Sequence, residues 1–250
     1  MAKNEVTVTE NKAVAVAEAP ALAVEISQED MMVPFLKVIQ SLSEEVVPGK
    51  DKYNENVRPG DIYDGVTRTV FKNASAVICG LKKYYAEWTP EVRGTLVGKH
   101  KADSDVVKNA VKIERKTDKG STFVQLQTAS GNELIETYGV VMIIKNGDGI
   151  TLPAVLTLSK TSFVVGKQLT TSLAIHQGAG VPVFKLTTSS SSNSKGSWFK
   201  PVFAFDSYET DENVINMAKG MAGMTDQILF GNYQSEDGAV SVPSLEDELL

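Results

Sequence analysis

The chain has 250 residues, 42% of them hydrophobic, and a formal net charge of -6 at pH 7. This predicts one compact body with a full core. A single cysteine, Cys79, excludes an internal disulfide. The chain has only two histidines, His100 and His176, so one chain cannot assemble a structural zinc site from cysteine and histidine ligands. No apolar run approaches the ~20 residues that span a bilayer, and the N-terminus lacks the pattern of a signal peptide. We therefore expect a cytoplasmic protein that needs no cofactor and does not enter a membrane.

The charge is distributed unevenly along the chain. Residues 31–205 carry 22 lysines and arginines against 15 aspartates and glutamates, a net charge of +7. Residues 1–30 carry a net charge of -4, and residues 206–250 carry -9. A basic body with acidic ends suggests a body that binds a polyanion and a tail that imitates one. The alternative is plain solvation, because acidic termini are common and usually disordered.

The first third of the chain predicts an arm followed by strands. Residues 1–29 have no stable hydrophobic period and no aromatic residue, so we expect a disordered acidic arm. Residues 31–42 fit either a short helix or an edge strand. After a turn at 58–61, the runs 62–71 and 76–85 are rich in Val, Ile and Tyr. We expect these two runs to be paired antiparallel strands.

The middle of the chain predicts a basic insertion and a hairpin. Residues 90–132 are polar and contain eight lysines and arginines, which indicates an insertion or a long loop over a basic face. Apolar runs at 134–144 and 150–158 flank the Asn-Gly-Asp-Gly sequence at 146–149. Two strands around such a turn are a strong hairpin signal.

A helical pattern begins at Ser159. The apolar residues then recur at helical spacing, Ser159 or Thr161 is placed to cap the helix, and the glycines at 178 and 180 end it. Lys160 and Lys167 are two turns apart and share the side opposite most of the apolar residues. They could bind successive phosphates, but an ordinary solvated helix face would have the same spacing.

The last third predicts two strands and a second helix. Strands at 181–187 and 198–205 should be separated by a flexible polar loop at 189–196. Residues 210–231 read as a C-terminal helix, weakened by its glycines at 220 and 223, and residues 232–250 as a disordered acidic tail.

Several antiparallel strands with one helix among them fit a small Greek-key barrel. We therefore expect a mainly β protein with some α. Its body, residues 30–209, would be an OB-type antiparallel Greek-key barrel with an extra helix, a basic loop insertion and disordered acidic tails.

The strand at 76–85 and its continuation combine cations with aromatic rings. Alternation puts Lys83 and Tyr85 on one face, and Lys82, Tyr84 and Trp88 on the other. Aromatic faces stack on bases while ammonium groups neutralise phosphates, which is the chemistry of sequence-tolerant single-strand binding.

A later strand repeats this combination with Lys195, Trp198 and Lys200, of which Trp198 and Lys200 alternate together. A Tyr or Trp in a strand is more often a core residue, so core packing is the alternative for Tyr85 and Trp198.

The end of the chain mixes acids with leucines, which suits docking to a partner protein better than solubility alone. The candidate partner-binding residues are Glu246, Asp247, Glu248, Leu249 and Leu250.

Five short features occur in a distinctive order. They are the segments 34–40, 58–63, 158–160 with 167–169, and 195–199, and an acidic C-terminus. This order resembles that of the single-stranded DNA-binding proteins of tailed bacteriophages, over roughly residues 31–205 plus the tail. The resemblance implies an OB-fold protein that coats single-stranded DNA in replication and recombination. It also implies a tail that recruits replication or recombination proteins, and a location in the cytoplasm of a bacterial host.

Enzyme motifs are not found in the sequence. The Gly-Lys pairs at 49–50, 98–99 and 166–167 lack the preceding glycine of a phosphate-binding loop, and no nucleophile elbow occurs. Asp61, Asp64 and Glu87 could hold Mg²⁺ for a nuclease, but Asp61 and Asp64 lie beside glycines, where turns explain them. The sequence therefore favours non-enzymatic binding of single-stranded DNA. The alternative is a phage structural or assembly protein that binds no nucleic acid.

Overall fold

The structure is a computed structural model that describes residues 33–91, 94–116, 120, 122–147, 151–193 and 196–231. These residues all belong to the unit Met32–Leu250. The arm predicted at residues 1–29 and the tail predicted at residues 232–250 lie outside the described residues.

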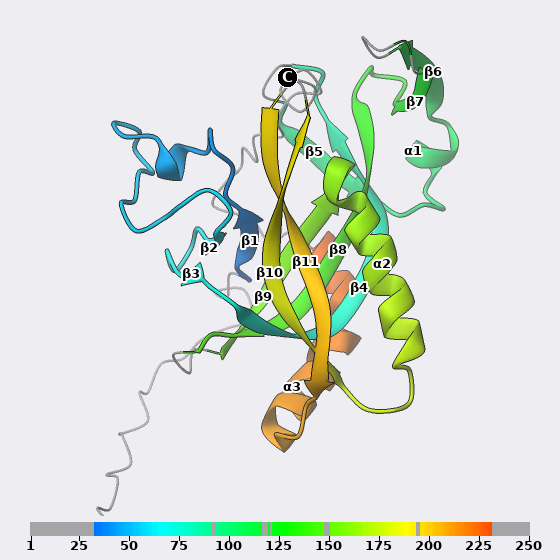
Figure 1. Cartoon of the computed structure of the whole chain (residues 1–250). Coiled ribbons are helices and arrows are strands. Elements are labelled where there is room, and N and C mark those ends of the chain that lie inside the picture. Colours follow the sequence, from blue (N-terminus) through cyan, green and yellow to red (C-terminus); the bar gives the residue numbers. More distant parts are fainter. Residues whose placement is uncertain are drawn as a thin grey trace, which may run out of the picture. The chain divides into compact units, whose positions relative to one another are not determined.

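The described residues form a β-rich body with short helices (Figure 1). The strands are β1 (Phe35–Val38), β2 (Ile62–Asp64), β3 (Val70–Phe71), β4 (Ala74–Trp88), β5 (Leu96–His100), β6 (Val111–Lys116), β7 (Thr122–Gln127), β8 (Glu133–Lys145), β9 (Thr151–Ser159), β10 (Pro182–Asn193) and β11 (Gly196–Tyr208). The α-helices are α1 (Asp105–Lys108), α2 (Phe163–Ile175), α3 (Glu212–Gly223) and α4 (Thr225–Phe230), and the 3-10 helices are η1 (Glu44–Val46) and η2 (Lys160–Ser162). None of the described helices is long and apolar enough to cross a membrane.

All the strands join one sheet in the order β11-β10-β4-β8-β9-β1-β2-β3, with β5 added to β4 and the β6–β7 hairpin added to β8. The predicted β-rich fold is therefore confirmed. Neighbouring strands are antiparallel except β1 and β9, which pair in parallel. The expectation of a purely antiparallel sheet is wrong at this one pair.

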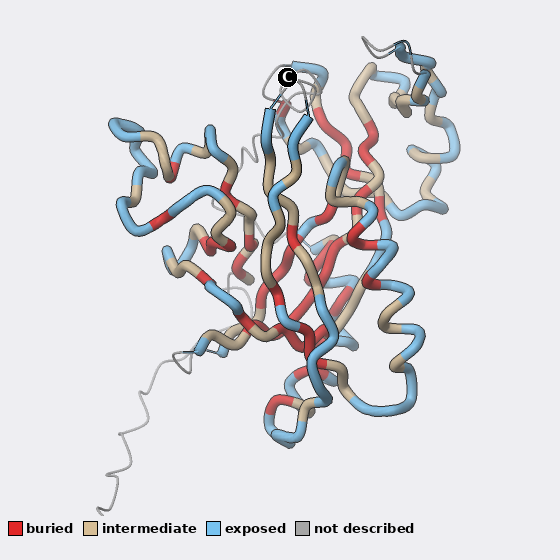
Figure 2. The backbone as a smooth tube through the Cα atoms, viewed as in Figure 1, coloured by how far each residue is buried: buried red, intermediate tan, exposed pale blue. Residues whose placement is uncertain are grey.

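The central strands β4, β8 and β9 are buried on both faces (Figure 2). On one face, side chains such as Met142, Leu156 and Phe184 form an inner core, which Val165 and Leu169 of α2 cover. On the other face, the intervening residues of the same strands pack against α3 and α4. Strand alternation explains this division, and burial on both faces explains why residues 134–144 are almost continuously apolar.

A side-chain contact links β11, at one end of the strand order, to the segment after β1. The Gln40 amide donates to the carbonyl of Phe199 (2.9 Å) and accepts from its N–H (2.9 Å). The Thr188 hydroxyl donates to the carbonyl of Gly60 (2.6 Å). The Gln40 amide thus gives Phe199 the two hydrogen bonds that a neighbouring strand would supply.

Several predicted elements need correction near the N-terminus. Residues 35–38 form a strand with neighbours on both sides, neither a helix nor an edge strand. The run 62–71 is two short strands, because the buried Asp64 carboxylate accepts hydrogen bonds from Val66 and Thr67 and holds a turn between them. Neither of these strands pairs with β4, so the expected pairing with 76–85 is wrong.

The insertion and the last hairpin are more regular than predicted. Residues 90–132 contain β5, α1, β6 and β7 instead of a long loop. Residues 189–193, predicted as flexible loop, pair with β11 up to Asn193 and Gly196. Long polar strands of this kind lack the alternation that marks a half-buried strand, because their hydrogen bonds and not their side chains hold them in the sheet.

The hairpin at β8–β9 and both helices are confirmed, with changes at the helix ends. The N-cap of α2 is Ser162, without a side-chain hydrogen bond, because η2 intervenes where Ser159 or Thr161 was expected to cap. The C-terminal helix is interrupted at Met224, one residue after Gly223.

Candidate nucleic-acid interface

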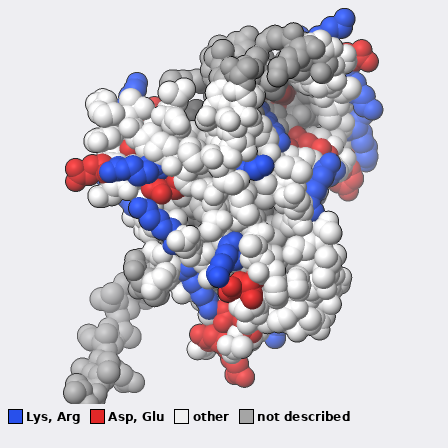
Figure 3. All heavy atoms as spheres, viewed as in Figure 1, with Lys and Arg blue, Asp and Glu red and all other residues white. Residues whose placement is uncertain are grey.

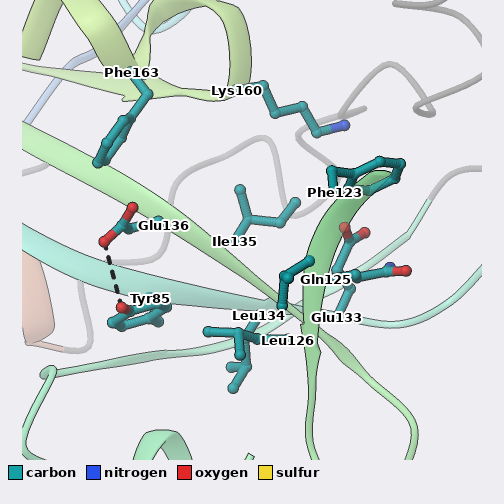
Figure 4. A pocket seen from close by; sticks show the side chains of 11 residues that line it. Tyr85, Phe123, Gln125, Leu126, Glu133, Leu134, Ile135, Glu136, Lys160 and Phe163 are labelled. Carbon is teal, nitrogen blue, oxygen red and sulfur yellow. Dashed lines mark hydrogen bonds between the residues drawn. The ribbon is translucent and has the colours of Figure 1, made fainter. Parts of the chain in front are cut away.

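An open groove of about 340 Å³ lies where β4, β7, β8 and η2 meet (Figure 4). Three aromatic rings line it, those of Tyr85, Phe123 and Phe163, together with the Lys160 side chain. Its other lining residues are Val124, Gln125, Leu126, Glu133, Leu134, Ile135 and Glu136. We call this feature the concave groove.

The edge of the concave groove on β4 and β8 carries a polar cluster. Tyr85 lies opposite Glu136 in the strand register, and its hydroxyl donates to Glu136 Oε1 (3.3 Å). Lys83 Nζ donates to the same oxygen (2.7 Å). The hydrogen bond and the negative charge of Glu136 raise the pKa of Lys83 above its ordinary value. Lys83 therefore stays a cation at this edge, but Glu136 offsets its charge.

The opposite edge is built at the start of α2. The Phe163 ring packs against Tyr138, with ring centroids 4.9 Å apart. Lys167 Nζ lies over the same Phe163 ring, 5.1 Å from its centroid, in a cation–π arrangement. Lys160 precedes α2, in η2, so the predicted two-turn spacing on one helix does not apply to it. Lys160 and Phe163 both line the groove, and the Lys160 side chain extends toward Phe123 (Figure 4).

Lys160 has a backbone conformation that most residues avoid. Its φ is 48°, in the left-handed region. This single position turns the chain from β9 into η2 and α2 and places the Lys160 side chain in the groove (Figure 4). A strained residue at a candidate site is consistent with a functional role.

Tyr84 and Trp88 are core residues, so their predicted role as stacking rings is withdrawn. Tyr84 is 1% exposed and Trp88 8% exposed. The Tyr84 ring meets the Phe230 ring edge-on, with centroids 5.7 Å apart. Burial raises the pKa of the Tyr84 hydroxyl. Lys82, on the same strand face, lies near Asp226 of α4, with 3.5 Å between Nζ and Oδ1.

Trp198 and Lys200 lie together on one face of β11, as the alternation predicts. The residue between them, Phe199, faces the other way. Its ring lies against Gly60, where a Cβ atom would come within 2.8 Å of it. Phe203 continues the Phe199 face and packs on the inner core. Trp198 and Lys200, both half-buried, therefore point away from the inner core, on a different sheet face from the concave groove.

Six predicted site residues fall where the structure describes nothing. They are Lys195, Glu246, Asp247, Glu248, Leu249 and Leu250, all outside the described residues. Their predicted roles stay predictions.

The comparison with known proteins gives one match. The family model described as Pam3 phage gp34-like protein matches residues 12–227. The chain belongs to this family. The match contains every residue of the concave groove and ends before the predicted acidic tail. No curated protein and no solved structure matches the chain.

The net positive charge of this gp34-like body is smaller than the charge of residues 31–205 implied. Three acids after residue 205 belong to the folded body and pair with its lysines: Asp206 with Lys185 (3.2 Å), Glu209 with Lys145 (2.5 Å), and Asp226 with Lys101 (2.7 Å). Over residues 31–231 the net charge is +3, from 23 lysines and arginines and 20 aspartates and glutamates. Figure 3 shows both signs on the surface, with Lys and Arg along the outer side of the β6–β7 hairpin.

Sequence reasoning missed Phe123 and Phe163 as candidate stacking rings. Phe123 fell in the segment interpreted as a loop, and Phe163 was counted only as an apolar residue of the helix. The alternation of residues 122–127, in which Val124 and Leu126 separate polar residues, was a signal for β7. No local signal could show that β7 lies across the groove from α2.

Proposed function

We propose that this protein binds single-stranded DNA in the concave groove, without reading sequence, during phage replication or recombination. The observation that supports this most is the convergence of three rings and Lys160 in one open groove, from four different elements. Rings of this kind stack on bases of any sequence, and the lysines bind the phosphates between them. On this proposal the protein is a binding protein and not an enzyme, and it works in the cytoplasm of the host.

The roles divide between the two edges of the groove. Lys160, in the groove, and Lys167, over the Phe163 ring, would bind phosphates, while Lys83 contributes less because Glu136 already pairs with it. With about three phosphates bound, log K should fall with log salt at a slope of about 2, since each phosphate on a single strand contributes about 0.7. Trp198 and Lys200, on the other face of the sheet, would form a second contact with DNA.

Two finer assignments belong to this proposal. The curved β-rich sheet would be an elaborated OB-type barrel, the fold that most often binds single strands through such a groove. The acidic tail would recruit replication or recombination proteins through its leucines and carboxylates.

The experiment is a titration with an unlabelled oligonucleotide at two salt concentrations, with matched variants. Phe123→Ala should cost about 1–3 kcal/mol of binding free energy if its ring stacks on a base. Tyr53→Ala is its control, because Tyr53 is an exposed ring (45%) outside the groove. Lys160→Glu should weaken binding and lower the salt slope by about 0.7–1.4. Lys219→Glu is the control for Lys160→Glu. It changes the net charge by the same amount, but on α3, which covers the opposite face of the sheet.

Three outcomes contradict the proposal. They are affinity that does not depend on salt, equal affinity for duplex DNA, and equal effects of Lys160→Glu and Lys219→Glu. Each contradicts binding of single strands in the concave groove, whereas no measurable binding would favour the alternative, a phage structural or assembly protein whose charge only keeps it soluble.

A further inference from the structure

The β6–β7 hairpin has one open edge. β6 pairs with β7 along its whole length, from Val111 opposite Gln127 to Lys116 opposite Thr122, without a bulge. In the described part of the chain β6 has no other neighbour, and β7 joins the main sheet through two residues only, Leu126 and Gln127. Five of the six residues of β6 are exposed. An unbroken exposed edge without proline is a template for another strand.

The charges on β6 alternate with its position. Lys112, Glu114 and Lys116 share one face of the hairpin, and Val111, Ile113 and Arg115 share the other. Neither Lys112 nor Glu114 has an ion-pair partner among the described residues. Lysines alone on an edge oppose pairing with a like strand, but the glutamate between them changes this.

Among the antiparallel registers of β6 with a second β6 that are centred on residues 112–115, only one sets no like charges opposite each other. In an antiparallel pair, two residues directly opposite each other lie on the same face of the sheet. When two copies of β6 pair symmetrically, one residue must therefore lie opposite its own copy, and this residue is the centre of the register. Centred on Ile113, the pairing sets Lys112 opposite Glu114 twice and joins the two isoleucines. Centred on Glu114, it sets glutamate against glutamate and Lys112 against Lys116. Centred on Lys112, it sets two lysines against each other. Centred on Arg115, it sets Glu114 opposite Lys116 twice but also arginine against arginine. Like charges directly opposite are destabilising.

We propose that β6 pairs antiparallel with β6 of a second copy of this chain, centred on Ile113, and so forms a two-fold symmetric homodimer. The resulting ribbon, β7–β6–β6–β7, joins the two molecules through their insertions. Because Phe123 on β7 lines the concave groove, each half of the ribbon carries one wall of a groove. An interface of one strand pair is small, so the dimer belongs to the weak class of complexes.

The test is sedimentation of the full chain over a range of concentrations, without DNA, so that its result does not depend on the proposed DNA binding. The wild type should show a concentration-dependent monomer–dimer equilibrium that weakens with salt. Lys112→Glu and Glu114→Lys should each weaken dimerisation on the order of tenfold, because each turns both attractive pairs into repulsive ones. An equimolar mixture of these two variants should form a heterodimer, since every facing pair is then opposite in charge.

The double variant K112E/E114K should dimerise like the wild type, and Lys219→Glu should have no effect. All these residues are exposed, so the variants should fold. A wild-type chain that stays monomeric at every concentration overturns the proposal. So does a mixture that associates no better than either single variant, because the register then plays no part.

Discussion

Tyr84 and Tyr85 are consecutive residues of one strand and have opposite environments. Tyr84 is buried against α4, while Tyr85 opens into the concave groove and donates to Glu136. Burial, together with the charge of Glu136, raises the pKa of the Tyr85 hydroxyl, so it stays protonated as a donor at neutral pH. Alternation predicts that two such neighbours differ, but it does not say which of them faces the core.

The two tryptophans give a test at the residue scale. Trp88→Ala should lower the free energy of unfolding by about 3–5 kcal/mol, because the indole is buried beside Tyr84 and Ile135. Trp198→Ala should cost clearly less stability, since its half-buried ring lies on the outward face of β11. If Trp198 contacts DNA, the same change should weaken binding by about 1–3 kcal/mol.

Thermal melting and oligonucleotide titration of both variants separate these effects. Quenching of tryptophan emission by DNA should persist in Trp88→Phe and disappear in Trp198→Phe. A larger stability loss for Trp198→Ala than for Trp88→Ala would contradict this assignment.

A buried carboxylate near the insertion makes stability depend on pH. Glu87 is 8% exposed. It accepts hydrogen bonds from Asn132 (2.7 Å), and its other oxygen lies 2.6 Å from His100 Nε2. Burial alone would raise the pKa of Glu87, but these two partners outweigh it and hold the pKa below its ordinary value of 4.5. The ionised carboxylate therefore stabilises the fold above about pH 4.5, and this contribution is lost as the pH falls through the lowered pKa.

We expect Glu87→Gln to be less stable than the wild type at pH 6, and the difference to shrink between pH 4.5 and pH 3. Urea unfolding at several pH values measures it. Glu55→Gln, at an exposed position, should give a curve parallel to that of the wild type. A Glu87→Gln difference that grows in acid would mean that the group is not ionised in the folded protein.

At the element scale, the seat of α4 on the sheet depends on a glycine. A Cβ on Gly80 would lie 2.2 Å from Thr225 Oγ1, which itself donates within the α3–α4 junction. Gly80→Ala should therefore cost about 1–3 kcal/mol of stability through overpacking. Gly220, inside α3, has open space around its Cβ position, so Gly220→Ala should add about 0.5–1 kcal/mol. Thermal melting should show opposite shifts, and shifts of one sign would contradict the packing.

The insertion at residues 90–132 contains strands that hydrophobic patterns in the sequence do not reveal. β6 carries five exposed residues out of six, so the alternation of Val111 and Ile113 with Lys112 and Glu114 marks no buried face. In its partner β7 the half-buried residues include Phe123 and Gln125, whereas Val124 of the apolar alternation is 56% exposed. Polar strands of this kind are held by backbone pairing, which the sequence does not encode residue by residue.

At the scale of the whole molecule, the segregated charge predicts a competition. Five acids and no bases lie in residues 232–250. Deleting these residues should tighten single-strand binding, most visibly at low salt, because on the proposed function this anionic segment would compete with DNA for the same lysines. The same deletion should abolish association with replication or recombination partners. Titration at two salt concentrations and co-purification with partners measure the two effects.

The leucines at the end of the chain provide the control for this deletion. A variant with Leu249→Ala and Leu250→Ala keeps every charge, so DNA binding should be unchanged while partner binding falls. Weaker DNA binding after the deletion would place the tail in the fold or the site, and the recruitment proposal would have to be withdrawn.

Elements with a local signal can be predicted from the sequence. The β8–β9 hairpin follows from its turn and from two apolar runs, and α2 follows from its 3.6-residue period. Which faces meet is seen only in the folded protein. Gln40 and Phe199 pair across 159 positions, and Phe123 and Phe163 line one groove from a polar hairpin and a helix. Hydrophobic periodicity indicates which residues are removed from water, because that removal drives folding whatever the neighbour is. It does not indicate which residues they contact, because those contacts depend on the path of the whole chain.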